Sequence, residues 1–488
     1  MPSTTFETGV SDHEYRQRIR KYAPSSLLPL IAATAARYRT PQEWLNSPYR
    51  IFTPWALADA ARVSLSHGTD FLRAEAADKD LLRILDAYAR FDDPFRRDKN
   101  LWAFLLRKSG EQLTWQTPDY QSLARTAAIF TQTAHTVPME CLKSGWDIGL
   151  FGCPLQEYVG AAQLIWAGAF ASAGRFDLAF YDTPDGQLIA RVVGRDTLTR
   201  VVDTHFAIDR DQFKAEDEKA RERSARRDPQ LRRFTYNPLR GRPLVTGIGP
   251  GYLCPVPQLA WAKATPWGVY FSGLDRYGDQ FAHDLGNLFE QYIGRQLRLL
   301  PDAQIIPEIT YGSKANRRKT VDWIVVFSDL VLLVEVKSTI PTEPVRLGTA
   351  DAAAEVVKKL SRAFEQIDIT AQLIKDGQPE LSCVPAGQPI LGMAITLEPF
   401  HLANAPFLYD LLPSTQTSIA IADAAEVEDL VTLTDVSASQ LLSERAADAE
   451  RSTWSVHSAF QGHTRSRNSI LDEAWNSYPW APANRAEC

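Results

Sequence analysis

The segment KTVDWIVVFSDLVLLVEVKST, which runs from Lys319 to Thr339, predicts the core of a β-sheet. Two apolar runs are separated by Ser328 and Asp329, residue types that favour tight turns. Runs of this length, rich in Val, Leu and Ile and joined by turn residues, are typical of a β-hairpin. The segment therefore predicts two antiparallel strands, over residues 320–327 and 330–338.

Three charged residues interrupt this apolar hairpin. Asp322 lies in the first run, and Glu335 and Lys337 stand where the second run ends. Because a strand presents every second side chain on one face, Glu335 and Lys337 point the same way. Ionised groups beside Val and Leu are costly to bury unless a partner compensates them, and a divalent cation would be such a partner. The pattern indicates a carboxylate-and-lysine metal centre suited to phosphodiester hydrolysis.

Composition bounds the class of protein. The chain has 488 residues, 45% of them hydrophobic, which is enough for two or three domains with their own cores. The net charge of −6 provides no global attraction to nucleic acid, so such binding would need local basic patches. The five cysteines show no metal-ligand spacing, which favours reduced thiols. With no apolar signal core near the start and no apolar run that could span a bilayer, we expect a cytoplasmic protein with no membrane partner.

The first part of the chain reads as helices. Apolar residues recur at three- and four-residue steps over Leu28–Tyr38, Pro54–Leu65 and Asp78–Phe91. Asp185 and Gly186 stand between two apolar runs and predict a β-hairpin there. We therefore expect residues 1–207 to form a mainly helical domain that recognises the substrate or a partner.

A charged segment follows, over residues 208–243. Its first half, FKAEDEKARERSARR from Phe213, mixes both signs at helical spacing and predicts a solvated helix. Its second half, RRDPQLRRFTYNPLRGRP from Arg226, is basic with aromatic interruptions and could bind phosphates. The alternative is a plain interdomain helix and linker.

The remaining chain predicts alternating elements. A helix over 281–300 is followed by a strand over 304–310, the hairpin, a long helix over 352–375, strands over 389–397 and 417–422, and a helix over 424–433. This order predicts an α+β or α/β domain, with a mixed sheet flanked by helices, over residues 244–436. Residues 437–488 predict a helical tail.

Three motifs in this domain carry a family resemblance. GNLFEQYIGRQL (286–297), TVDWIVVF (320–327) and LLVEVKS (332–338) place an acid on the first helix, Asp in one strand and Glu-x-Lys in the next. Their order resembles the PD-(D/E)XK nuclease superfamily, which has the restriction-endonuclease-like fold, over residues 280–435. Val321 stands where the family's motif has proline. The rest of the chain resembles no family that we can name.

The resemblance implies roles for particular residues. Asp322 and Glu335 would bind Mg²⁺ or Mn²⁺, with the carbonyl of Val336 as a third oxygen ligand. Lys337 would orient the attacking water, although a plain ion pair with Glu335 is the alternative. Glu290 on the first helix would complete the metal shell, or else has a structural role.

Two further groups would contact the substrate. The family often places a Lys or Gln of the long helix near the site, and Gln366 is our candidate, with a solvated helix face as the alternative. The loop 311–320 carries four cations and no acid, and we expect it to bind phosphates unless it is merely a solvated hairpin loop. Its cations are Lys314, Arg317, Arg318 and Lys319.

The sequence and the resemblance together predict a Mg²⁺-dependent endonuclease. Family prevalence favours DNA over RNA as substrate. The pairing of a nuclease with a helical module resembles bacterial defence effectors that act on phage or foreign DNA, and two-strand cleavage by this fold commonly uses a homodimer. The alternatives are a nuclease-fold binding or assembly subunit activated by a protein partner, and a ribonuclease.

Overall fold

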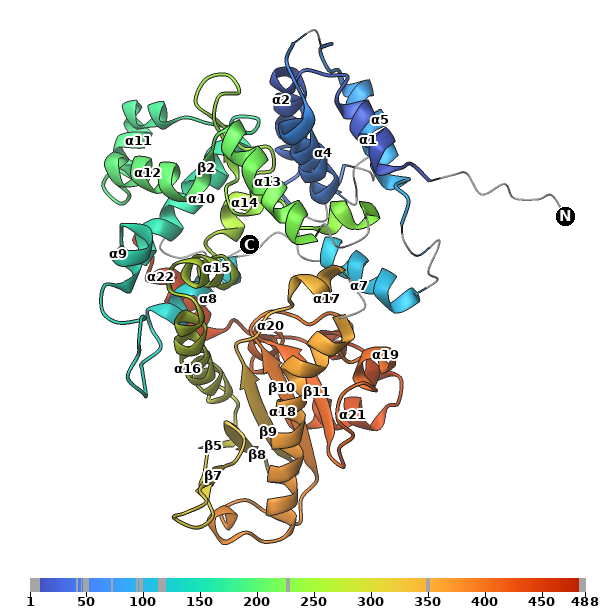
Figure 1. The fold of residues 1–488 in the computed structure, drawn as a ribbon. Helices are drawn as coiled ribbons and strands as arrows, with labels where there is room; N and C mark the ends of the chain where they lie inside the picture. The colour runs from blue at the N-terminus through green and yellow to red at the C-terminus, as the bar shows by residue number, and fades with distance from the viewer. Residues whose placement is uncertain are drawn as a thin grey trace, which may run out of the picture. The chain divides into compact units, whose positions relative to one another are not determined.

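Two compact units make up the chain in the computed structural model (Figure 1). The first unit comprises residues 1–126, 144–272 and 476–488, and the second comprises 127–143 and 273–475. The structure describes residues 9–40, 43–44, 46, 52–71, 73–93, 95, 100–112, 120–224, 229–347 and 352–481. Each unit is thus assembled from segments that are distant in sequence.

The first unit is mainly helical, as predicted. Its core packs the apolar faces of the first four helices below, which include the three predicted from their periodicity. The first unit also contains a four-stranded sheet of two-residue strands, in the order β1-β4-β3-β2. None of the described helices is long and apolar enough to cross a membrane. Its elements, of which α8 and α15 continue into the second unit, are α1 (Asp12–Ile19), α2 (Pro24–Ala35), α4 (Pro54–His67), α5 (Asp78–Ala89), α7 (Leu101–Gln112), α8 (Tyr120–Phe130), α9 (Trp146–Phe151), α10 (Leu155–Ala171), β1 (Arg175–Phe176), α11 (Pro184–Ile189), α12 (Arg195–Val201), β2 (Ala207–Ile208), α13 (Arg210–Ser224), β3 (Leu244–Val245), β4 (Tyr252–Leu253), α14 (Gln258–Ala262) and α15 (Pro266–Tyr277).

The hairpin predicted at Asp185 and Gly186 is wrong, because these residues lie inside helix α11. Thr183 is the N-cap, and its hydroxyl accepts a hydrogen bond from the backbone N–H of Gly186 at 3.1 Å. Pro184 occupies the first helical turn, where its fixed φ and missing N–H are favourable. The Thr-Pro start of the helix therefore outweighs the Asp-Gly turn signal.

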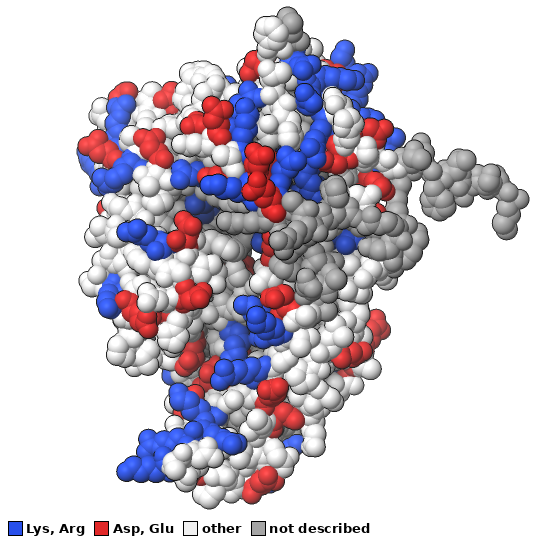
Figure 2. Space-filling model, viewed as in Figure 1, with Lys and Arg blue, Asp and Glu red and all other residues white. Residues whose placement is uncertain are grey.

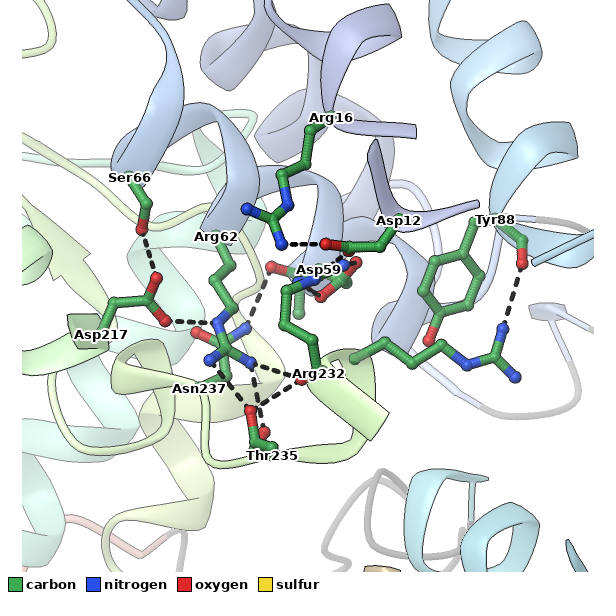
Figure 3. Close-up of polar contacts among 12 residues, drawn as sticks. Asp12, Arg16, Asp59, Arg62, Ser66, Tyr88, Asp217, Arg232, Thr235 and Asn237 are labelled. Carbon is green, nitrogen blue, oxygen red and sulfur yellow. Dashed lines mark hydrogen bonds and ion pairs between the residues drawn. The ribbon is translucent and has the colours of Figure 1, made fainter. Parts of the chain in front are cut away.

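The basic half of the charged segment is not a free phosphate-binding surface over its described residues. Arg232 and Arg233 are 7% and 8% exposed. Arg232 binds Asp59 of α4 through two hydrogen bonds, of 2.8 and 2.9 Å, while Arg62 of the same helix donates to Asp217 of α13 at 2.5 Å (Figure 3). Paired charges of this kind are strongly bound and hold the segment to the helices. Residues 225–228 lie outside the described residues.

The boundaries of the units differ from the expected domains. Residues 244–272, which we expected to begin the nuclease domain, belong to the first unit. The reason is that β3 pairs with β2 and with β4, so this segment completes the sheet of that unit. Most of the expected tail, over 437–475, belongs to the second unit.

The second unit is built around a mixed five-stranded sheet, in the order β11-β10-β9-β8-β5. Strands β9, β10 and β11 are parallel, whereas β8 and β5 are antiparallel to their neighbours. The predicted mixed sheet flanked by helices is therefore confirmed. Its elements are α16 (Asp279–Leu297), β5 (Gln304–Pro307), β6 (Thr310–Tyr311), β7 (Arg318–Lys319), β8 (Trp323–Val326), β9 (Val331–Lys337), α17 (Glu343–Leu347), α18 (Ala352–Lys375), β10 (Ile390–Thr396), α19 (Pro406–Tyr409), β11 (Ser418–Asp423), α20 (Ala424–Leu430), α21 (Ala438–Ala447) and α22 (Ser469–Asn476), the last ending in the first unit.

Alternation along β8 holds two helices against the sheet. Ile324 is buried with Leu333 and with the apolar stripe of α18, which lies in front of the sheet in Figure 1. Its neighbour Trp323 packs instead on Gly294 of α16, where an added Cβ would lie 2.2 Å from the indole ring. Because successive residues of a strand point to opposite faces, α16 and α18 cover opposite sides of the sheet.

The outer edge of β11 is closed by a side chain. Asn404 donates to the carbonyl of Ile421 at 2.8 Å and accepts from the N–H of the same residue at 2.9 Å. One amide thus imitates a strand partner at this position. Free edges invite pairing with other chains, so Asn404 protects the sheet.

Candidate metal centre

Asp322 and Glu335 are brought together by the register of the β8–β9 hairpin. Trp323 lies opposite Val334, and continuing this pairing by one residue places Asp322 opposite Glu335. The carboxylate of Asp322 accepts a hydrogen bond of 2.7 Å from the backbone N–H of Val336. Both carboxylates therefore stand at one end of the hairpin.

Glu335 and Lys337 form an ion pair on the same face of β9, with 2.6 Å between Oε1 and Nζ. Glu335 is 6% exposed, and its other oxygen, Oε2, is buried without a hydrogen-bond partner among the described residues. Burial, and after it the negative charge of Asp322, raises the pKa of Glu335 to about 7. Burial also raises the pKa of Asp322. The charge of Lys337 therefore compensates the two buried carboxylates only in part.

Glu290 approaches from α16, and Trp323 fixes the helix at this point. The indole N–H of Trp323 donates to the carbonyl of Glu290 at 3.0 Å. Gly294, one turn later, leaves the space that the indole ring of Trp323 fills. Burial, followed by the charges of Asp322 and Glu308, raises the pKa of Glu290 to about 7. Glu290 therefore shares the electrostatic environment of Asp322.

A β-bulge lies beside Asp322. Pro307 is opposite Trp323, and Thr310 is opposite Lys319. Between these two pairs, residues 308–309 on one segment face residues 320–322 on the other. The three-residue side is 320–322, and it ends in Asp322. Bulges re-aim side chains and are common next to active sites. This feature depends on pairing between strands, and nothing in either strand alone indicates it.

Glu308 belongs to this site, although the sequence analysis did not identify it. Continuing the β5–β8 register by one residue places Glu308 opposite Asp322. Its Oε1 lies 2.7 Å from Nζ of Lys319. The signal in the sequence was an acid at the end of an apolar strand, the same signal that identified Glu335.

Gln366 contacts the backbone that leads to Asp322. Its Nε2 donates to the carbonyls of Lys319 and Thr320, the latter at 2.9 Å. One turn later, Oγ1 of Thr370 accepts from the N–H of Val321 at 3.1 Å. Helix α18 thus holds the three-residue side of the bulge in place. Gln366, which we expected near the substrate, thus uses its amide nitrogen to hold the chain that leads to Asp322.

The predicted basic loop is the exposed hairpin β6–β7. Figure 2 shows Lys and Arg gathered over this hairpin, with further blue patches between α16 and α18. Lys314, Arg317 and Arg318 are exposed, and none of the three has an ion pair within the part of the chain that the structure describes. Lys319 differs from them because it is paired with Glu308.

The residues fit a divalent cation that keeps part of its water shell. Within the described ranges, no three His, Cys, Asp or Glu side chains are placed to hold a metal ion together. Mg²⁺, however, is usually bound through one or two carboxylates and retains several waters. The unpartnered Oε2 of Glu335 and the raised pKa values of the acids are consistent with a missing positive charge.

Comparison with known proteins adds no further assignment. No protein-family model matches the chain, and no curated protein or solved structure matches it significantly.

Proposed function

We propose that the second unit is a restriction-endonuclease-like domain that hydrolyses phosphodiester bonds with a divalent metal ion. The observation that carries the proposal is the meeting of Asp322, Glu335 and Lys337 at one end of the β8–β9 hairpin. One buried oxygen of Glu335 has no hydrogen-bond partner among the residues that the structure describes. An unpartnered oxygen of a buried carboxylate is costly, and a bound cation would satisfy it.

Asp322 and Glu335 would hold Mg²⁺ or Mn²⁺, and the carbonyl of Val336 stays a predicted third ligand. When bound, the metal would supply Lewis acidity and lower the pKa of water at the site. The ammonium of Lys337 carries three donors, of which Glu335 uses one, so the others can orient water or a phosphate oxygen. Glu290, whose pKa is raised to about 7, can accept a proton near neutral pH.

The exposed cations of the β6–β7 hairpin favour a polyanion as substrate. Phosphate contacts of this kind position a nucleic acid without reading its bases. The resemblance to PD-(D/E)XK nucleases favours DNA over RNA. The helical first unit would then contact the substrate or a protein partner.

The test is cleavage by the purified full-length chain of linear, circular and single-stranded DNA and of RNA, with Mg²⁺ or Mn²⁺. We expect Lys337→Ala to reduce cleavage by at least about 10²-fold, because a donor aimed at developing charge is lost. Lys358→Ala, which removes an exposed cation on α18, is the matched control and should cleave as wild type does. If Lys337→Ala and wild type cleave every substrate equally, the proposed function is wrong.

A further inference from the structure

We propose that Lys319 is a second active-site lysine, held by Glu308, which contacts the substrate phosphate at the metal centre. This inference rests on the proposed function and assigns to that site two residues with distinct tasks. Lys319 would bind the phosphate, and Glu308 would position Lys319. The three other cations of the hairpin would bind phosphates farther along the nucleic acid.

Two Glu–Lys pairs flank Asp322. On β9, Glu335 is 2.6 Å from Lys337, and on the other side, Glu308 is 2.7 Å from Lys319. Continued by one residue beyond its last pairs, the strand register places Glu308, Asp322 and Glu335 in one row at the ends of β5, β8 and β9. A phosphate that reaches the carboxylates at Asp322 therefore meets a lysine on each side.

The backbone of Lys319 is fixed, unlike that of an exposed loop tip. Lys319 pairs with Thr310, and its carbonyl accepts from Gln366. The next residue, Thr320, is tied to Ile309 by two hydrogen bonds, of 2.9 and 3.0 Å. The base of the hairpin is thus held both by the neighbouring strand and by α18.

The side chain of Lys319 retains the capacity to bind a phosphate. It is 65% exposed, and an ammonium has three donors, so Glu308 does not exhaust them. A compact ammonium held in one place suits a single phosphate oxygen.

Lys319 and the three cations at the tip of the hairpin should affect kcat and KM differently. Lys319→Ala should lower kcat by about 10²-fold, as expected for a donor that acts mainly in the transition state. It should raise KM less than the triple variant below does, because one phosphate contact is lost and not three. The triple variant Lys314→Ala, Arg317→Ala, Arg318→Ala should raise KM and leave kcat near that of wild type. Lys319→Arg should recover part of the kcat, since the positive charge is kept.

A double-mutant cycle tests the positioning role of Glu308. Glu308→Gln keeps the size of the side chain and removes its charge, and it should lower kcat about 10-fold in wild type but have little effect in Lys319→Ala. Glu365→Gln, an exposed acid on α18, is the matched control. If Glu308→Gln costs as much with Lys319→Ala as without it, Glu308 acts independently and its assignment is wrong.

A binding measurement separates this inference from the proposed function. Anisotropy of a fluorescein-labelled DNA duplex is followed in EDTA over a range of salt concentrations, with melting curves to verify that each variant folds. Lys319→Ala should weaken binding and lower the salt slope by about 0.9, the value for one lost phosphate contact. Failure of wild type to cleave any substrate would refute the proposed function. Unchanged binding, slope and kcat in Lys319→Ala would refute the inference alone.

Discussion

Replacing Glu335 with glutamine should make the metal-free protein more stable at alkaline pH. The reason is the burial of a carboxylate that has one oxygen without a hydrogen-bond partner among the described residues. Glutamine keeps the shape of the side chain and removes the charge that burial disfavours. Residues at functional sites often reduce the stability of the fold. A buried carboxylate that would bind a metal is expected to be such a residue.

The magnitude follows from the raised pKa of Glu335. An acid whose pKa rises from 4.5 to about 7 on folding is ionised in the unfolded chain at pH values where the folded protein still holds its proton. Stability therefore falls as pH increases from about 4.5 to about 7 and stays low above that. The difference corresponds to about 3 kcal/mol. The ion pair with Lys337 lowers the pKa of Glu335 and is therefore already contained in this value, so we expect a gain of about 3 kcal/mol near pH 8.

Hydrogen exchange of peptides that cover β8 and β9 measures this effect locally. In EDTA, Glu335→Gln should protect these strands more than wild type near pH 8, and the gain should largely disappear near pH 5. Excess Mg²⁺ should protect wild type and not the variant, because only a metal bound to the folded state adds stability. Weaker protection of Glu335→Gln than of wild type in EDTA near pH 8 would refute the argument from burial.

Three further substitutions test how the fold supports the site. Gly294→Ala should reduce cleavage and destabilise the second unit by about 1 kcal/mol in thermal unfolding, because the clash with Trp323 exceeds the gain in helix propensity; an unchanged Tm and rate would contradict the packing described. Asp59→Ala should cost about 1.5–3 kcal/mol in urea unfolding, because Arg232 stays buried with Asp12 in place of its bidentate partner, and a loss below about 1 kcal/mol would show that the pair is dispensable. Asn404→Ala should promote self-association in sedimentation velocity, because the edge of β11 is opened; a monomeric variant would show that other groups protect the edge.

Patterns along single segments predicted the elements of the second unit well. The apolar stripe of α18 and the alternation in the hairpin are consequences of burying one face, so periodicity alone indicates them. The same reasoning identified Asp322, Glu335 and Lys337 as charges at the ends of apolar strands. The structure places the two acids opposite each other across the hairpin and the lysine beside Glu335.

Features that depend on pairing between segments were not predicted. The bulge before Asp322 arises because the two segments that connect the paired positions differ in length by one residue. Glu308 lies at the site only because its strand pairs with the strand that follows Asp322. The basic segment that contains Arg232 was interpreted as phosphate-binding, because the partner of Arg232, Asp59, lies far away in the sequence. At residues 183–186 two local signals disagreed. The Thr-Pro helix start determined the structure, and the Asp-Gly turn signal did not.

The most direct test of the central claim is cleavage of a labelled DNA duplex by the purified chain beside its Asp322→Asn variant, each with Mg²⁺ and with EDTA. We predict that wild type cleaves only with Mg²⁺ and that Asp322→Asn, which keeps the size of the side chain, does not cleave in either condition. Equal cleavage by wild type and Asp322→Asn, or undiminished cleavage by wild type in EDTA, would contradict the assignment of the metal centre.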